Sequence, residues 1–212
     1  MGESIHSKLL LHSKSIRHSK SILGWVTEVV LIGVAVFLGL LANQWQSDRQ
    51  HREMAGATLR YFHDEIVANK LAIEKVRSYH VALGTDVGRF LHVEGPKTMQ
   101  QFQSDVHFRG VEPVEFERTA WDLALATQAL SYLPPKLAYA ISRVYTRQLA
   151  FQSLQNGFLQ AVLAPTAFGA QDMTGLATSM DWYLHDVNVQ EPQLIALYDQ
   201  LLPQIDAATP KQ

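Results

Sequence analysis

The pattern of apolar and polar residues changes near residue 46. Across residues 22–45 apolar residues follow one another almost without interruption, and up to Ala42 the only charge is Glu28, next to the hydroxyl of Thr27. On a helix, the residues from Ile22 to Ala42 cover about 30 Å, the thickness of the hydrocarbon core of a bilayer. The pattern therefore predicts one transmembrane helix over 22–45.

Two tryptophans lie near the ends of this segment. On a helix, Trp25 and Trp45 are about 30 Å apart, as residues of the two interfacial aromatic belts are. A buried helix this long usually shows a polar stripe, which is absent here. A cleaved signal peptide would have a shorter apolar run and a small residue before its cleavage site, which Leu40 and Leu41 do not provide. We therefore expect an uncleaved signal anchor.

From residue 46 onwards apolar residues recur at intervals of three, four and seven, which is typical of amphipathic helices. A long helix is expected over 46–92, with the inward stripe Leu59, Phe62, Ile66, Ile73, Val76, Leu83, Val87 and Phe90. A second is expected over 134–163, with the inward stripe Leu137, Ile141, Val144, Gln148, Phe151, Gln155, Phe158 and Val162. These two helices would be the long members of a bundle.

The other segments are predicted to be shorter. Gly95 and the prolines that follow it suggest an irregular loop over 93–113. A helix is expected over about 114–131, with the inward stripe Phe116, Ala120, Leu123, Thr127 and Leu130. Two more helices are expected over 176–188 and 191–207, the last with Leu194, Tyr198, Leu201 and Ile205 inward. Because no segment alternates like a strand, the predicted fold class is all-α, with one N-terminal transmembrane helix running into an extramembrane helical bundle.

Charge divides the chain at the apolar segment. The tail, residues 1–21, carries the basic residues Lys8, Lys14, Arg17 and Lys20, whereas residues 46–212 hold 14 of the 18 basic and 18 of the 20 acidic residues. Each cation on such a tail contributes about 1 kcal/mol to binding anionic lipid headgroups. The acidic excess argues against nucleic acid as a partner of the domain.

The same charges predict an orientation. The cations of the tail outnumber Arg49, Arg52 and Arg60, which follow the apolar segment among acids. By the positive-inside rule the N-terminus is expected in the cytoplasm and residues 46–212 on the other side of the membrane.

The tail contains His-Ser-Lys three times, at His6, His12 and His18. On a helix this period places successive histidines about 120° apart, and in an extended chain about 20 Å apart, so they cannot share one metal ion. A pH-sensing role is chemically possible. The interpretation we favour is a basic tail lying on headgroups.

Candidate chemistry is sparse in the rest of the chain. There is no cysteine, which excludes disulfides, thiolate zinc sites and iron–sulfur clusters, and no phosphate-binding or hydrolase motif. His63 and Asp64 are expected on adjacent helix faces, unable to act together, while Asp181 and His185 share a face. We therefore expect no enzyme activity, no metal and no cofactor.

Small residues in the apolar segment suggest a contact with another helix. Ala35 and Gly39 form a small-xxx-small pair and Gly33 adds a notch, a pattern that lets a second helix approach closely. Glu28, near the headgroup level, could form a salt bridge with such a partner. These four residues are the predicted membrane-partner contact.

Two stretches resemble a known family. The stretch 28–50 is similar to the anchor of an uncharacterised family of bacterial single-span membrane proteins, in which Glu and an apolar run with Gly are followed by Asn-x-Trp; Glu28, Gly33, Asn43 and Trp45 match. The stretch 119–148 resembles a later helical segment of that family. The resemblance covers about a quarter of the chain and supports this architecture, but it implies no activity. For a bacterial protein, the orientation predicted above gives an expected location in the inner membrane, with residues 46–212 in the periplasm.

Three functional hypotheses follow. The first is a non-catalytic accessory subunit that packs against and stabilises a larger membrane complex, possible hosts being energy-transducing, respiratory, photosynthetic or transport complexes. The alternative is a periplasmic helical sensor that binds a ligand and acts through a membrane partner, although few residues precede the span. A membrane-tethered enzyme is the weakest of the three.

Overall fold

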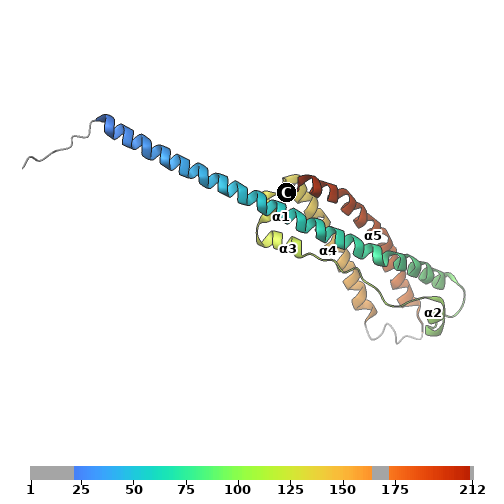
Figure 1. The fold of residues 1–212 in the computed structure, drawn as a ribbon. Helices are drawn as coiled ribbons and strands as arrows, with labels where there is room; N and C mark the ends of the chain where they lie inside the picture. The colour runs from blue at the N-terminus through green and yellow to red at the C-terminus, as the bar shows by residue number, and fades with distance from the viewer. Residues whose placement is uncertain (1–21, 164–171, 211–212) are drawn as a thin grey trace, which may run out of the picture. The chain divides into compact units, whose positions relative to one another are not determined.

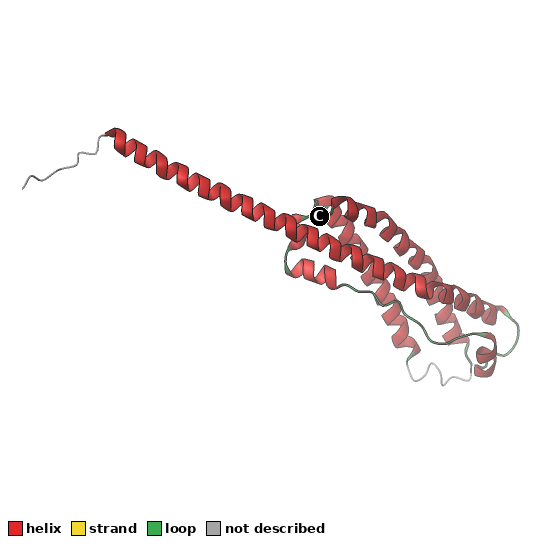
Figure 2. Ribbon diagram, in the orientation of Figure 1, coloured by secondary structure: helices red, strands yellow, loops and turns green. Residues whose placement is uncertain are grey.

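The structure is a computed structural model that describes residues 22–163 and 172–210 (Figure 1). Within these ranges every regular element is helical, which confirms the all-α class (Figure 2). The elements are α1 (Ile22–His92), α2 (Met99–Asp105), α3 (Thr119–Ala126), the 3₁₀ helix η1 (Ala129–Tyr132), α4 (Pro135–Val162) and α5 (Thr174–Ala208). The chain divides into two compact units, residues 1–48 and 49–212.

The first unit contains the apolar part of α1. This part of the helix is long and apolar enough to cross a membrane, and none of it is buried within the chain. Every side chain from Gly24 to Gln46 is exposed, on all sides of the helix.

The second unit is built from the remainder of α1 together with α4 and α5. These three long helices lie side by side (Figure 1). All eight residues of the stripe predicted over 59–90 are buried, as are all eight of the stripe predicted over 137–162. Periodicity alone therefore located the buried stripes of two of the three long helices that form the core.

The last helix differs from the prediction. The two helices expected over 176–188 and 191–207 are one continuous helix, α5, which passes through Pro192 and Pro203. A proline inside a helix removes one backbone hydrogen bond and costs about 3 kcal/mol. The buried stripe of α5 continues at helical spacing across Pro192, from Val187 through Glu191 to Leu194, and this packing outweighs the cost.

Two shorter segments also differ. The irregular loop expected over 93–113 contains α2, whose N-terminus is capped by the Thr98 hydroxyl accepting a hydrogen bond from the Gln101 backbone N–H at 3.2 Å. The helix expected over 114–131 begins only at Thr119 and ends at Ala126. Consequently Phe116 precedes that helix.

The inward stripe predicted for α3 is confirmed at Ala120 and wrong at Leu123. The structure buries Ala120 and Ala124, whereas Leu123 is 47% exposed. A helix of this length makes barely two turns, so its few side chains carry too short a pattern to define a face.

Candidate functional site

The four predicted partner-contact residues lie on the exposed part of α1. At about 100° per residue, Glu28, Ala35 and Gly39 fall within about 60° of one another around the helix, whereas Gly33 lies more than about 100° from each of them. A Cβ atom added at Gly33 or Gly39 would meet no heavy atom within 4 Å. The structure therefore brings three of the four residues onto one face, where a second helix could approach.

The predicted belt residues are exposed as well, Trp25 at 63% and Trp45 at 65%. The headgroup contacts predicted at Lys8, Lys14, Arg17 and Lys20, with the histidine repeat, lie outside the described residues.

The second unit contains an arrangement that the sequence did not reveal. Residues 106–118, here called the strap, have no regular secondary structure and connect α2 to α3 (Figure 2). Val106, Val111 and Val114 of the strap are buried. The strap runs antiparallel to α1. The contacts described below show this, because residues later in α1 bond to residues earlier in the strap.

Two amide side chains hold the strap by its backbone. Asn69 of α1 donates to the Glu117 carbonyl at 2.8 Å and accepts from the Glu117 N–H at 2.7 Å. Gln155 of α4 accepts from the Val114 N–H at 2.7 Å and donates to its carbonyl at 3.0 Å. Each amide satisfies the two backbone groups of one residue, as a neighbouring strand would.

Glu65 of α1 anchors the end of the strap. One carboxylate oxygen accepts from the Ala120 N–H at 2.7 Å, in the first turn of α3, and the other accepts from the Tyr145 hydroxyl at 2.5 Å. A carboxylate there satisfies a helix N-terminal donor and interacts favourably with the helix dipole. Burial, together with the hydrogen bond to Glu65, raises the pKa of Tyr145 far above its usual range, so this hydroxyl remains a donor.

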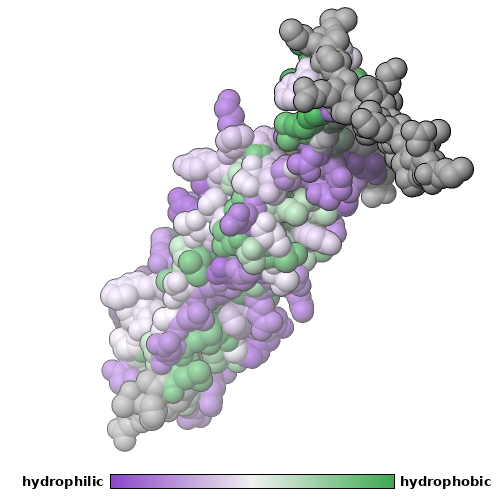
Figure 3. Space-filling view, turned by 90° about the vertical axis from the view of Figure 1, so that its left-hand side faces the viewer, coloured by the Kyte–Doolittle hydropathy of each residue, from purple (hydrophilic) through white to green (hydrophobic). Residues whose placement is uncertain are grey.

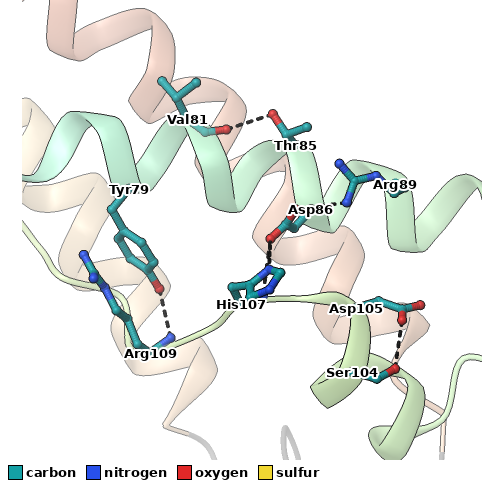
Figure 4. Close-up of polar contacts among 9 residues, drawn as sticks. All are labelled: Tyr79, Val81, Thr85, Asp86, Arg89, Ser104, Asp105, His107 and Arg109. Atoms are coloured by element: carbon teal, nitrogen blue, oxygen red, sulfur yellow. Dashed lines mark hydrogen bonds and ion pairs between the residues drawn. The ribbon is translucent and has the colours of Figure 1, made fainter.

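The other end of the strap is held by Tyr79 and Asp86 of α1 (Figure 4). The Tyr79 hydroxyl donates to the Gly110 carbonyl at 2.6 Å and accepts from the Arg109 N–H at 3.1 Å. The Asp86 carboxylate lies 2.7 Å from His107 Nδ1 and accepts from the His107 backbone N–H at 3.3 Å. The hydrogen bond from the His107 side chain lowers the pKa of Asp86.

Between these ends lies a pair of buried ionisable residues. His80 of α1 and Glu191 of α5 are both 0% exposed, and His80 Nδ1 lies 2.6 Å from Glu191 Oε1. His80 Nε2 lies 3.1 Å from the carbonyl oxygens of Val111 and Glu112 in the strap. One imidazole ring thus connects α1, α5 and the strap.

The pKa of His80 is raised above its ordinary value. Burial alone would lower it, but the hydrogen bond to Glu191, the charge of that carboxylate and the two strap carbonyls together outweigh burial. The imidazolium form is therefore favoured, as expected for a buried histidine paired with a carboxylate.

Two grooves open on the surface of the second unit. One, of about 250 Å³, lies between α4 and α5 and is lined by Arg143, Arg147, Gln190, Gln193, Leu194, Ala196, Leu197 and Gln200. The other, of about 470 Å³, is lined by Tyr61, Asp64, Glu65, Ala68, Glu117, Thr119, Ala120 and Leu123. The face drawn in Figure 3 intersperses hydrophilic and hydrophobic residues.

Of the predicted polar pairs, His63 and Asp64 form a surface contact. His63 Nδ1 lies 3.2 Å from Asp64 Oδ1, so these two side chains do contact each other, although they were expected on adjacent faces and unable to act together. His63 Nε2 also lies 3.4 Å from Asp206 Oδ1. Within the described ranges, no group of three His, Cys, Asp or Glu side chains could hold a metal ion.

Comparison with protein-family models, with curated proteins and with solved structures finds no match to this chain. The resemblance noted for 28–50 and 119–148 therefore stays an expectation. The functional interpretation rests on the chain's own chemistry.

Proposed function

We propose that this protein is a single-span accessory subunit that packs against a larger bacterial membrane complex and stabilises it without catalysing a reaction. The observation that carries the proposal is the apolar part of α1, which is exposed on every side. Apolar residues around a whole helix are stable only in lipid or against other apolar helices. The face shared by Glu28, Ala35 and Gly39 is the proposed contact with a neighbouring subunit.

The use of buried polar groups supports a structural role for the second unit. Glu65, Asn69, His80 and Gln155 are buried and each hydrogen-bonds to the strap or to the start of α3. Catalytic sites direct several such groups towards a shared cavity, whereas of these four residues Glu65 alone lines one of the two grooves described above. The polar interior of this unit maintains a shape, which is what a bracing subunit requires.

The location is part of the proposal. The cations of residues 1–21 would hold the N-terminus at the cytoplasmic face of the inner membrane, against anionic headgroups. Residues 46–212 would then lie in the periplasm.

The first experiment is to extract the tagged protein from native membranes in mild detergent, size the particle and identify its contents by mass spectrometry. We expect a large particle in which other subunits are present in fixed ratio. A free monomer or homodimer would refute the subunit proposal.

A pair of glycine substitutions then tests the contact face. Gly39→Leu fills the small-residue face, so we expect the protein to leave the complex while its domain stays folded. Gly33→Leu adds the same bulk on another side of the helix and serves as the matched control. Equal loss of assembly in both variants would contradict a contact centred on Ala35 and Gly39.

The groove between α4 and α5 favours a second candidate function, a sensor for a small anion. Arg143 and Arg147 lie one turn apart on α4, and α4 contains no acidic residue. Two guanidinium groups at this spacing can bind one carboxylate or phosphate, with glutamine amides as further donors.

The sensor candidate predicts binding by the full-length protein in detergent. Citrate and inorganic phosphate are suitable probes in calorimetry, and Arg147→Gln should abolish the signal. Arg118→Gln is the control, because Arg118 is paired with Asp122 at 2.9 Å. Binding that survives Arg147→Gln would eliminate the groove as the site.

A further inference from the structure

The His80 ring is surrounded by acceptors at both of its nitrogens. Nδ1 faces a carboxylate oxygen and Nε2 faces two backbone carbonyl oxygens. Carbonyl oxygens can only accept, so Nε2 must carry a proton for these contacts to be favourable. An ionised Glu191 also only accepts, so Nδ1 must carry one too. With an ionised Glu191, the geometry therefore requires two protons on the ring, which is the imidazolium form.

We propose that the His80–Glu191 pair is a pH-controlled latch, in which imidazolium holds the middle of the strap against α1 and loss of one proton releases residues 109–113. The proposal is independent of whether the protein is an accessory subunit or a sensor. It concerns a conformational change within the second unit.

The geometry determines which contact is lost. A neutral imidazole keeps one proton, and a hydrogen bond to a carboxylate is about twice as strong as one to a neutral carbonyl. The proton therefore remains on Nδ1, facing Glu191 Oε1, and the proton of Nε2 goes to solvent. The Nε2 lone pair then faces the oxygens of Val111 and Glu112. That repulsion acts on the strap and leaves the contact between α1 and α5 intact.

The backbone of the strap is strained where His80 holds it. Glu112 has a φ of 45° in the left-handed region, although it is not a glycine. That conformation costs an L-residue about 1–2 kcal/mol. Gly110, with a φ of 128°, adopts a conformation that only glycine adopts readily. Release of the latch lets Glu112 relax, so strain adds to the repulsion.

Other ionisable groups near His80 do not replace it. In the strap, Glu112 is paired with Arg109 at 2.7 Å, and Arg109 lies over the ring of Tyr79, the neighbour of His80 on α1. On α5, burial and the charge of Glu191 raise the pKa of Tyr183, which keeps that hydroxyl neutral.

The remaining long helix contributes no competing acid or base. The sequence of α4 contains no acid and no histidine, and its arginines Arg143 and Arg147 line the surface groove. Of the groups considered, Glu191 is the one that exchanges a charge-assisted hydrogen bond with His80.

The direction of the pH effect follows from the raised pKa of His80. A histidine whose pKa is raised on folding contributes its stability below its ordinary value of about 6.5 and loses it as pH rises through the folded value. The latch is therefore closed below the folded pKa of His80 and opens as the pH rises through it.

Hydrogen exchange of the full-length protein in detergent micelles, measured by mass spectrometry from about pH 6 to about pH 9, tests the latch. After correction for intrinsic exchange rates, we expect the opening of peptides covering 109–113 to rise about tenfold per pH unit above the folded pKa of His80, since one proton is lost. Peptides from α4 should show no such rise.

Two variants and one spectroscopic measurement complete the test. His80→Gln cannot titrate and should abolish the rise, whereas His185→Gln, which changes an exposed histidine of α5, should leave it unchanged. If His80→Gln does not fold, ¹⁵N NMR of the wild-type His80 ring should show protons on both nitrogens at about pH 6 and on Nδ1 alone after titration. Any one of three results would overturn the proposal. These are hydrogen exchange of 109–113 that parallels that of α4 at every pH, a rise in exchange that persists in His80→Gln, and a His80 ring that keeps its Nε2 proton.

Discussion

The two parts of α1 have the same backbone conformation and opposite arrangements of apolar residues. In the part that belongs to the first unit, leucine, valine and isoleucine occur on every side and remain exposed. In the part that belongs to the second unit, they form one stripe, from Leu59 to Phe90, that is buried against other elements. The other sides of this part of the helix are mostly polar, with Leu71 and Val81 among the few exposed apolar residues.

This difference shows that one helix is adapted to two environments. A single stripe suffices where the chain supplies its own core. A helix that is apolar on all sides requires an apolar environment that this chain does not provide within the described residues. The two parts should therefore respond differently to identical substitutions.

The largest difference between the two parts of α1 is expected when side-chain volume is removed. Ile73, which is 0% exposed, and Leu38, which is 57% exposed, lie on the same helix. Ile73→Ala should lower the free energy of unfolding of the domain by about 2–5 kcal/mol, because it leaves a cavity. Leu38→Ala should change it by less than about 0.5 kcal/mol.

Chemical denaturation of the full-length variants in detergent, followed by circular dichroism, measures both values. A similar destabilisation by the two substitutions would mean that the apolar part of α1 contributes to the stability of the domain after all.

An added charge should have the larger effect in the apolar part of α1 and the smaller effect in the part that belongs to the second unit. Leu38 and Leu71 are 57% and 58% exposed. Leu38→Arg should disfavour membrane insertion by about 3 kcal/mol, the cost of arginine near the centre of a spanning helix. Leu71→Arg places the same charge on a water-facing surface and should have little effect. Alkaline extraction of membranes followed by immunoblotting distinguishes the two, and equal retention of both variants would contradict a transmembrane role for this segment.

The sequence predicts the stripes better than it predicts the strap, for a physical reason. A buried stripe repeats every three or four residues, so its signal is local and appears in both long helices. The contacts of the strap join Asn69 to Glu117 and Gln155 to Val114. Polar side chains at such separations carry no periodicity that would reveal their partners.

Two of the differences between the predicted and the observed helices could have been recognised from residues close together in the sequence. Thr98 and Gln101 have the spacing of a capping box, which could have predicted the start of α2. The apolar spacing that continues across Pro192 could have indicated that α5 is a single helix. The proposed latch at His80 had no such sequence signal, because an isolated histidine in a helix is usually a surface or core residue.

Removing a polar side chain should also affect the two parts of α1 differently, with a smaller difference in the free energy of unfolding. Asn69→Ala deletes both hydrogen bonds to Glu117 and leaves the backbone N–H and carbonyl of Glu117 unsatisfied. This should lower the free energy of unfolding by about 1–3 kcal/mol. Gln44→Ala deletes an exposed hydrogen bond to Asp48 in the other part of α1 and should cost less than about 0.5 kcal/mol. Denaturation curves that give equal losses would show that burial does not strengthen the Asn69 contact.

The smallest effect is expected from Asp86, whose carboxylate bonds to the exposed His107. A carboxylate whose pKa is lowered on folding contributes stability above its ordinary pKa of about 3.9 and loses it as pH falls through the folded value. Because solvent screens His107, the contribution should stay below about 1 kcal/mol. Wild-type protein should therefore be more stable than Asp86→Asn at about pH 6, and the gap should close towards about pH 2. A gap that persists at the acidic end would mean that the advantage of Asp86 over asparagine does not depend on its charge. The strap would then have one pH-sensitive contact, at His80, instead of two.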